Sequence, residues 1–583
     1  MMQKVLFLIL WTLCLFALDG LTYEDRQVLF LEQYERNIVN DLETTQQGIY
    51  DDSLTYETKV FYEINHEAQA LLDKAQFAKN PYSLVKKAFD IHTKMQNGMF
   101  AVLSMSEKKV YMQEHRIYLD ALFKATIQPF EVKETFNRWI NYKRTLFDRE
   151  NLLFSNHEMR AKKNIINRKK RELATAYQER PINRSVIASL KIDIEHFEKS
   201  LSSDLSKTFV ASTISFYELS TVLKPNELYM DFAKIGDFYY LFTLNKDNKI
   251  GFEKLDAFSI DNLLQKIQKR REKIINLENF PNIKEAKEEY GNLYQLIMKN
   301  ISLKDKTSVI ISPDGLLNLL PFEALYFQKY LVERLDIRYV PSAKELLKLH
   351  KNSSVSNDKI ILFANPNFNS KRIKNKDVRG DIFKNLTPTF SRLKGTLREA
   401  NKIKSLFPFA TLFSGNMASE SNLLKTTSPK ILHLATHGFF LENDAILNPM
   451  LKSGIVLSGA NNSIENLTGE GIITALELSE LNLKGTALVV LSACNTGVGK
   501  IEEGEGVAGL NKAFISAGTK QIIMSLWSVS DSSTALLMEK FYENIKQGDS
   551  YNMALNSAKK WMIKHDKSHP YYWAGFVSSG LDN

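Results

Sequence analysis

The strongest fold signal lies near the C-terminal end, in ILHLATHG (residues 431–438) and ALVVLSACNTG (residues 487–497). Each stretch is a run of branched apolar residues that leads to a reactive side chain and then a glycine. Such runs are typical of strands buried in a parallel sheet, and residues at the carboxyl ends of these strands line the ligand crevice of an open α/β sheet. We therefore expect His437 and Cys494 to lie at one edge of one sheet.

Other apolar segments surround these two stretches. In the C-terminal part we expect further strands at 360–364 and 521–525, with covering helices from Leu397, over 506–517 and over 532–547. Strand and helix alternate, which predicts a mostly parallel sheet covered by helices on both faces. Strand patterns also occur upstream, at 228–232, 238–244, 308–312 and 337–341. They indicate a first α/β unit, which has no His/Cys pair of its own.

The residues before this first unit have a helical pattern. Their clearest apolar stripe, with a strict 3-4-3-4 spacing, consists of Ile187, Leu190, Ile194, Phe197 and Leu201. We expect this stripe to pack on a helix that carries Ile166, Leu173 and Tyr177. At 583 residues the chain is too long for one core, so we expect a multidomain protein, an all-α region followed by α/β units. The predicted divisions are 1–20, 21–208, 209–350 and 351–583.

The first twenty residues differ from the rest. Lys4 precedes fourteen apolar or near-apolar residues, 5–18, and Asp19 follows them. This length fits the core of a signal peptide better than a membrane span, which needs about 20 residues. The cleavage signal is poor, so membrane anchoring through residues 5–18 stays open. In either case we expect an exported protein that is periplasmic, secreted or membrane-anchored.

Charge and cysteine content narrow the classes of function. The excess of 76 Lys+Arg over 67 Asp+Glu is a mild bias, and the basic clusters contain no interleaved aromatic residues, so no nucleic-acid partner is expected. The cysteines are Cys14, inside the apolar leader, and Cys494. A lone thiol with a histidine elsewhere is a candidate nucleophile, although a free cysteine also commonly packs as a small buried residue.

The histidine pair His433 and His437 does not fit a metal site. Two residues four apart in a strand lie about 13 Å apart, too far to share one ion. We expect His433 to be a core residue, no metal and no cofactor. His437 precedes Cys494 by 57 positions, and this order and spacing match the caspase-like arrangement, not the papain-like one. The N–H groups of Gly438 and Cys494 are candidates for stabilising an oxyanion.

Eight short motifs in order resemble the CHAT domain, a caspase- and separase-related peptidase-like domain that usually accompanies tetratricopeptide-type helices. They extend over almost everything from about Leu223 to Gly580 and read SPDG (312–315), LPFEAL (320–325), YVPS (339–342), HLATHG (433–438), LSACNTG (491–497), GEG (504–506), SLWSVSD (525–531) and HPYYWAGF (569–576). The resemblance implies a caspase-like fold for 351–583 and degenerate tetratricopeptide-like helices for 21–208.

The resemblance also implies roles for single residues. His437 matches the general base, Cys494 the nucleophile, and Asp531 an acidic residue that binds a basic side chain at the substrate position before the cleaved bond (P1). Glu505 is a second acidic candidate, or a loop charge that interacts with backbone N–H groups. Trp527, like Trp573, either walls the cleft or packs in the core.

These features predict a cysteine endopeptidase that cleaves a protein or peptide substrate after a basic residue. A second hypothesis is a scaffold or signalling module that binds partner proteins through its helical region. A third combines the two, with activity released when an activating protein binds that region.

Overall fold

The computed structural model of the chain describes residues 66–100, 103–144, 184–208, 213–275, 281–351, 357–370, 390–440, 450, 452–462, 471–492, 500–502, 506–565 and 567–581, with single positions between 162 and 173. The predicted leader, 1–20, lies outside the described residues. Within these ranges, no helix combines the length and the apolar character that a membrane span requires.

One sheet of eleven strands joins the two α/β units, in the order β3-β2-β1-β4-β7-β18-β17-β14-β10-β8-β9. The strands are β1 (Glu227–Ile235), β2 (Phe238–Leu244), β3 (Ile250–Asp256), β4 (Ser308–Ser312), β7 (Asp336–Tyr339), β8 (Ile360–Pro366), β9 (Thr411–Gly415), β10 (Ile431–Ala435), β14 (Leu488–Leu491), β17 (Gln521–Ser525) and β18 (Phe576–Gly580). The β1–β2, β2–β3 and β17–β18 pairs are antiparallel and the others are parallel. The prediction of a mostly parallel sheet is confirmed.

Smaller sheets flank the large one. They are formed by β11 (His437–Phe440), β12 (Ser453–Val456) and β13 (Ile472–Thr474), by β15 (Lys500–Glu502) and β16 (Gly506–Ala508), and by β5 (Tyr326–Phe327) and β6 (Lys329–Tyr330). The start of the helix predicted over 506–517 is therefore wrong. Gly506–Ala508 pair as a strand with β15, and the helix begins at Leu510.

The helices of the helical region include one over residues 66–76, α4 (Tyr82–Met99), α5 (Met105–Glu114), α6 (Arg116–Ala125), α7 (Pro129–Tyr142) and α10 (Arg184–Thr208). Those of the first unit are α11 (Phe216–Thr221), α12 (Ala257–Ile275), α13 (Ile283–Ile297) and α14 (Ala343–Lys351). Those of the second unit are α15 (Lys394–Leu406), α16 (Glu420–Leu424), α18 (Ala475–Leu478), α19 (Leu510–Ser516), α20 (Asp531–Gln547), α21 (Tyr551–Lys564) and α22 (Pro570–Trp573).

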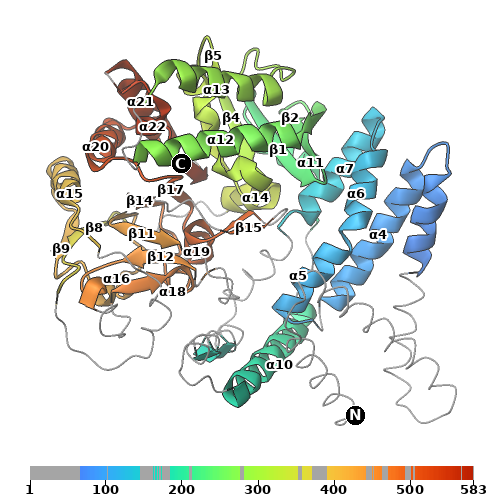
Figure 1. Cartoon of the computed structure of the whole chain (residues 1–583), viewed down its shortest axis with the longest axis horizontal. Coiled ribbons are helices and arrows are strands. Elements are labelled where there is room, and N and C mark those ends of the chain that lie inside the picture. Colours follow the sequence, from blue (N-terminus) through green and yellow to red (C-terminus); the bar gives the residue numbers. More distant parts are fainter. Residues whose placement is uncertain are drawn as a thin grey trace.

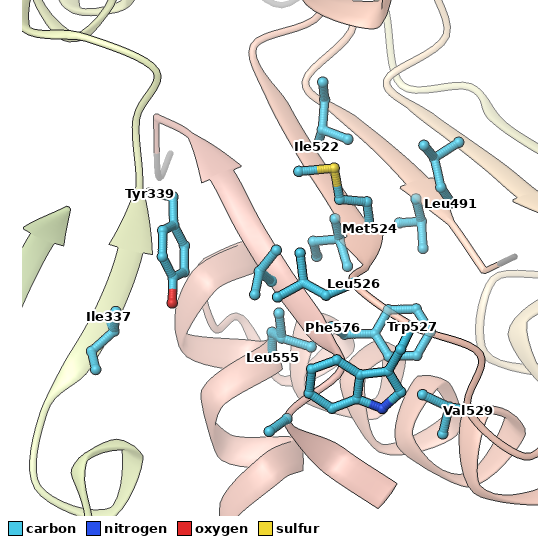
Figure 2. Packing of buried hydrophobic residues seen from close by; sticks show 14 of the residues in the cluster. Ile337, Tyr339, Leu491, Ile522, Met524, Leu526, Trp527, Val529, Leu555 and Phe576 are labelled. Carbon is cyan, nitrogen blue, oxygen red and sulfur yellow. The ribbon is translucent and has the colours of Figure 1, made fainter. Parts of the chain in front are cut away.

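Strand β18 makes the two units continuous. It lies between β7 of the first unit, to which it is parallel, and β17 of the second, to which it is antiparallel. Figure 2 shows the core at this junction, where side chains of β7, β17 and β18 meet. The reversal means that β1, β4 and β7 run opposite to β17, β14, β10 and β8. Ser312, which ends β4, therefore lies at the opposite edge of the sheet from Ala435, which ends β10.

Helices cover both faces of the first unit. Alternate residues of a strand point to opposite faces, so Met230 and Phe232 belong to the core cluster of α12 and α13, whereas Tyr229 and Ala233 belong to that of α4, α6 and α7. Helices α4, α6 and α7 thus form one layer of the α/β fold, and Figure 1 shows α7 beside this part of the sheet. The predicted stripe on α10 is also confirmed, since it packs with Ile166 and Leu173, and Tyr177 lies outside the described residues.

A buried charge joins the helical region to the sheet. The Nζ atom of Lys143, which follows α7, lies 2.8 Å from Asp231 Oδ1 in β1 and donates to Ser312 Oγ at 2.7 Å. Trp139 of α7 donates its Nε1 hydrogen to the same carboxylate at 2.9 Å. Lys143 and Asp231 are both buried, so this ion pair is shielded from solvent and fixes how α7 sits on the strands.

A second buried ion pair explains the LPFEAL motif. Glu323 Oε1 lies 2.7 Å from Lys559 Nζ of α21, and the hydroxyl of Tyr339 donates to its other carboxylate oxygen at 2.5 Å. Both charged side chains are fully buried. The motif therefore connects the first unit to a helix of the second, far along the chain.

Candidate functional site

His437 starts the small sheet beside the carboxyl end of β10. Strand β10 ends at Ala435, the hydroxyl of Thr436 donates to the carbonyl of Val456, and His437 pairs with Val456 as the first residue of β11. The turn at Thr436 sends the chain out of the large sheet. His437 is half-buried at this edge.

A backbone carbonyl orients the His437 imidazole. Its Nε2 atom lies 2.8 Å from the carbonyl oxygen of Ser391, in the segment that leads into α15. A carbonyl can only accept, so Nε2 carries the hydrogen, and in the neutral ring Nδ1 is the nitrogen with the lone pair. The rings of Phe368 and Phe390 pack at 5.4 and 5.5 Å from the imidazole. The ring is thus held as a base that acts through Nδ1.

The surroundings of His437 also favour the neutral ring. Burial lowers the pKa of His437 below its ordinary value, while the hydrogen bond to Ser391 and the charge of Asp531 act in the opposite direction. Burial dominates because a charged imidazole loses more hydration than a neutral one. A neutral imidazole at neutral pH is the form that accepts a proton.

Asp531 lies near this base at the start of α20. Its Oδ2 atom accepts a hydrogen bond of 2.6 Å from the backbone N–H of Gly395 in the first turn of α15, and the residue is exposed. A Cβ atom at Gly395 would lie 2.4 Å from this carboxylate, so glycine is required for the approach. The beginning of α15 therefore contacts both His437, through Ser391, and Asp531.

Strand β14, which precedes the predicted nucleophile in the sequence, ends at the same edge as β10. It lies beside β10 and parallel to it, with Val490 opposite His433, and its last described neighbour is Ser492. Cys494 with its N–H group, and Glu505, lie outside the described residues. Gly438 follows His437 in β11, opposite Ile455. The structure thus positions the strands that lead to His437 and Cys494 side by side.

The two tryptophans lie in the core. Trp527 is 3% exposed, donates its Nε1 hydrogen to the carbonyl of Tyr571 and carries the Arg271 guanidinium over its ring at 4.1 Å. Trp573 is fully buried against Tyr330. Of the two uses that the sequence left open for these residues, the structure favours packing.

The core position predicted for His433 is confirmed. The residue is fully buried, and its ring lies between Glu399 of α15 and Tyr542 of α20. Sequence reasoning missed Glu399, although a signal exists, because Thr396, Ala400 and Ile403 form a buried stripe on α15 in which a glutamate is unexpected. Ser391 acts through its backbone, so its side chain gives no signal. Among the described side chains, no three of His, Cys, Asp or Glu are grouped to hold a metal ion.

Comparison with known proteins places this geometry in a family. The CHAT domain model matches residues 287–581, half of the chain. Tetratricopeptide repeat protein 28 is similar: the human protein is 24% identical over 309 residues, which is 47% of this chain and 12% of the relative. The mouse protein is 25% identical over 193 residues, which is 29% of this chain and 8% of the relative. The chain spans about a tenth of the length of these curated relatives.

The comparison with solved structures gives matches of low similarity. The separase–securin complex of Saccharomyces cerevisiae has a TM-score of 0.43 and 12% identity over 96% of this chain and 43% of that chain. The Arg-specific cysteine proteinase gingipain R has a TM-score of 0.32 and 10% identity over 51% of this chain and 67% of that chain.

Proposed function

Because the chain belongs to the CHAT domain family, we propose that it is a cysteine endopeptidase that cleaves protein substrates after a lysine or arginine. The observation that carries the proposal is the orientation of His437. With Nε2 donating to Ser391, Nδ1 is the proton acceptor at the sheet edge to which β14 leads. A thiol needs such a base to become a nucleophile at neutral pH.

The chemistry follows from these roles. His437 Nδ1 takes the thiol proton of Cys494, and the thiolate attacks the carbonyl carbon of the substrate. The N–H groups of Gly438 and Cys494 stabilise the tetrahedral oxyanion. The imidazolium returns the proton to the leaving amine, and an acyl-enzyme remains. A water molecule, deprotonated by His437, then hydrolyses the thioester. No cofactor takes part in these steps.

Asp531 is proposed to select the residue before the cleaved bond. Its side chain is exposed, and its carboxylate is already anchored by Gly395, so the remaining oxygen can accept a charge-assisted hydrogen bond from a basic side chain. An anchored carboxylate loses little conformational entropy when a ligand binds, which favours its use in recognition.

We also propose that an activating protein partner binds the helical region of this endopeptidase. The helices α4, α6 and α7 form a layer of the fold, and Lys143 extends from this layer to Ser312 of β4. A protein that shifts these helices would therefore act on the sheet itself. We also propose that the chain acts after export, on the basis of the apolar residues 5–18.

The test uses the full chain with fluorogenic peptides that differ only at P1, with lysine, arginine, leucine or aspartate. Cleavage of the lysine and arginine peptides, lost in Cys494→Ala and in His437→Ala, supports the proposal. Asp531→Asn should reduce cleavage of basic peptides by more than tenfold and leave the leucine peptide unchanged. Cleavage that survives in Cys494→Ala would overturn it, and partner binding without any cleavage would favour the scaffold hypothesis.

A further inference from the structure

A second polar cluster lies buried beneath the candidate site and has no role in the proton transfers described above. It consists of Glu399 from α15, His433 from β10, Ser492 after β14 and Tyr542 from α20. All four residues are at most 4% exposed. A polar group in such a place is costly unless it is satisfied, so the cluster calls for a specific explanation.

Glu399 is the centre of this cluster. The hydroxyl of Ser492 donates to its Oε2 atom at 3.1 Å, and its Oε1 atom lies 2.9 Å from His433 Nε2. On the other side of the imidazole, His433 Nδ1 lies 3.0 Å from the hydroxyl oxygen of Tyr542. One carboxylate thereby joins two neighbouring strands to a helix, and the imidazole extends the chain of contacts to a second helix.

The register of the sheet explains why these groups meet. His433 lies opposite Val490, so the two side chains point to the same face, and Ser492, two residues further, points there too. Helices α15 and α20 pack together over this face, and Lys402 joins them through Glu539 and Glu543 at 3.1 and 3.2 Å. The packing of α15 on this face thus places the Glu399 carboxylate next to the end of β14.

Glu399 Oε2 accepts from Ser492, and the Tyr542 hydroxyl is the donor in its contact with His433 Nδ1. Glu399 Oε1 and His433 Nε2 lie close together but make no hydrogen bond. Burial, together with the Glu399 charge, raises the pKa of Tyr542 well above its ordinary value, so its hydroxyl stays protonated and can donate. Each of the four residues has a polar neighbour within 3.1 Å, so the cluster is one continuous chain of contacts.

We infer that Glu399 is a positioning residue for the nucleophile: through Ser492 it holds the end of β14, from which the chain leads to Cys494 two residues later. The inference rests on the proposed function, since it concerns the same thiol. An apolar residue at 399 would fill the space and avoid burying a charge, but it could not hold the Ser492 hydroxyl. A nucleophile displaced by about 1 Å can lose about a hundredfold in rate.

The experiment measures the thiol itself and needs no substrate. In a Cys14→Ser background Cys494 is the sole thiol, and its labelling by iodoacetamide is followed from pH 5 to 10 in the full chain. A thiol next to a histidine should be labelled with a midpoint below the ordinary value of about 8.5. His437→Ala should return the midpoint to that value, and this arm tests the proposed function alone.

Two variants test Glu399, with a matched control for the loss of a buried charge. Glu399→Ala and the milder Ser492→Ala should each raise the midpoint, by about one pH unit for the first and by less for the second. In the double variant the midpoint should equal that of Glu399→Ala, because both changes break one contact. Glu323→Gln removes a carboxylate equally buried, against Lys559, but far from β14, and should lower stability without moving the midpoint.

The outcomes separate the two ideas. A low midpoint that depends on His437 but not on Glu399 would overturn the inference and leave the proposed function intact. A shift in Glu399→Ala with none in Ser492→Ala would also overturn it, since the route through Ser492 would be absent. If Glu399→Ala does not fold, Ser492→Ala decides alone. A midpoint of about 8.5 in the parent protein that His437→Ala does not change would reject the proposed dyad.

Discussion

The Nε2 atom of His437 donates to the backbone carbonyl of Ser391 at 2.8 Å, while Asp531 accepts from the N–H of Gly395 four residues later. One short segment before and within α15 therefore sets the tautomer of the base and the position of the acidic side chain.

The acid limb of the pH–activity profile should lie below pH 6.5. Only neutral His437 accepts a proton, and burial holds its pKa below the ordinary 6.5, so activity should fall only below that pH. The charge of Asp531 raises this pKa, so Asp531→Asn should move the acid limb further down. The measurement is kcat/KM against pH with a leucine peptide, which does not depend on binding of a basic side chain. A limb at or above pH 6.5 would contradict the assignment.

Gly395→Ala should weaken recognition of basic residues. The new Cβ atom would lie 2.4 Å from the Asp531 carboxylate and displace it, so KM for the arginine peptide should rise about tenfold with little change in kcat. The matched control is Gly291→Ala in α13, where the nearest atom is a carbonyl oxygen at 3.6 Å. That helical change should stabilise the fold by up to about 1 kcal/mol. Equal kinetics in both variants would refute the role of the Gly395 contact.

Lys143→Met should strongly destabilise the junction between the helical layer and the sheet. It leaves the Asp231 carboxylate buried without its cation, which costs about 3–5 kcal/mol. Adding Asp231→Asn should recover part of this loss. Lys87→Met removes an exposed ion pair with Glu67 and should cost less than about 1 kcal/mol. Denaturant unfolding followed by circular dichroism gives the comparison, and similar losses for both lysine variants would count against the buried pair.

The helical layer should lose stability in acid because of His92. This residue is 2% exposed, stacks with Tyr118 and His115, and has a pKa lowered by burial to about 3. The pKa of His92 in the unfolded chain is about 6.5, so below that pH the unfolded chain binds a proton at this residue and the folded chain does not. The free energy of unfolding therefore falls as pH decreases from about 6.5 toward 3. The slope from one group is at most about 1.4 kcal/mol per pH unit. His92→Phe should flatten the loss of melting temperature between pH 7 and pH 5, and an unchanged slope would assign it to other groups.

The sequence predicts best what local pattern determines. The runs at 431–435 and 521–525 are apolar enough to be buried strands in any context, and both lie in the large sheet. The strand Phe576–Gly580 gave no such signal, because its polar residues Ser578 and Ser579 become strand only by pairing with β7 and β17. The same holds at the site, where the identity of His437 was visible but the Ser391 carbonyl, contributed by a distant segment, was not.

Glu399 combines a feature that the local sequence pattern predicts with one that depends on distant segments. Its place on a stripe of buried residues could be predicted, but its partners could not, since Ser492 and His433 come near only when α15 packs on the sheet. A lone charged residue on an apolar helix face is therefore a useful signal for a buried network, although it does not say which network.

The position of β18 also bears on how the protein is made. This strand, synthesised after all the others described, lies between β7 and β17 in the middle of the sheet. Until residue 580 has left the ribosome, β7 and β17 are both unpaired on the side that β18 will occupy. Neither half of the sheet can therefore reach its final strand pairing before β18 has been made.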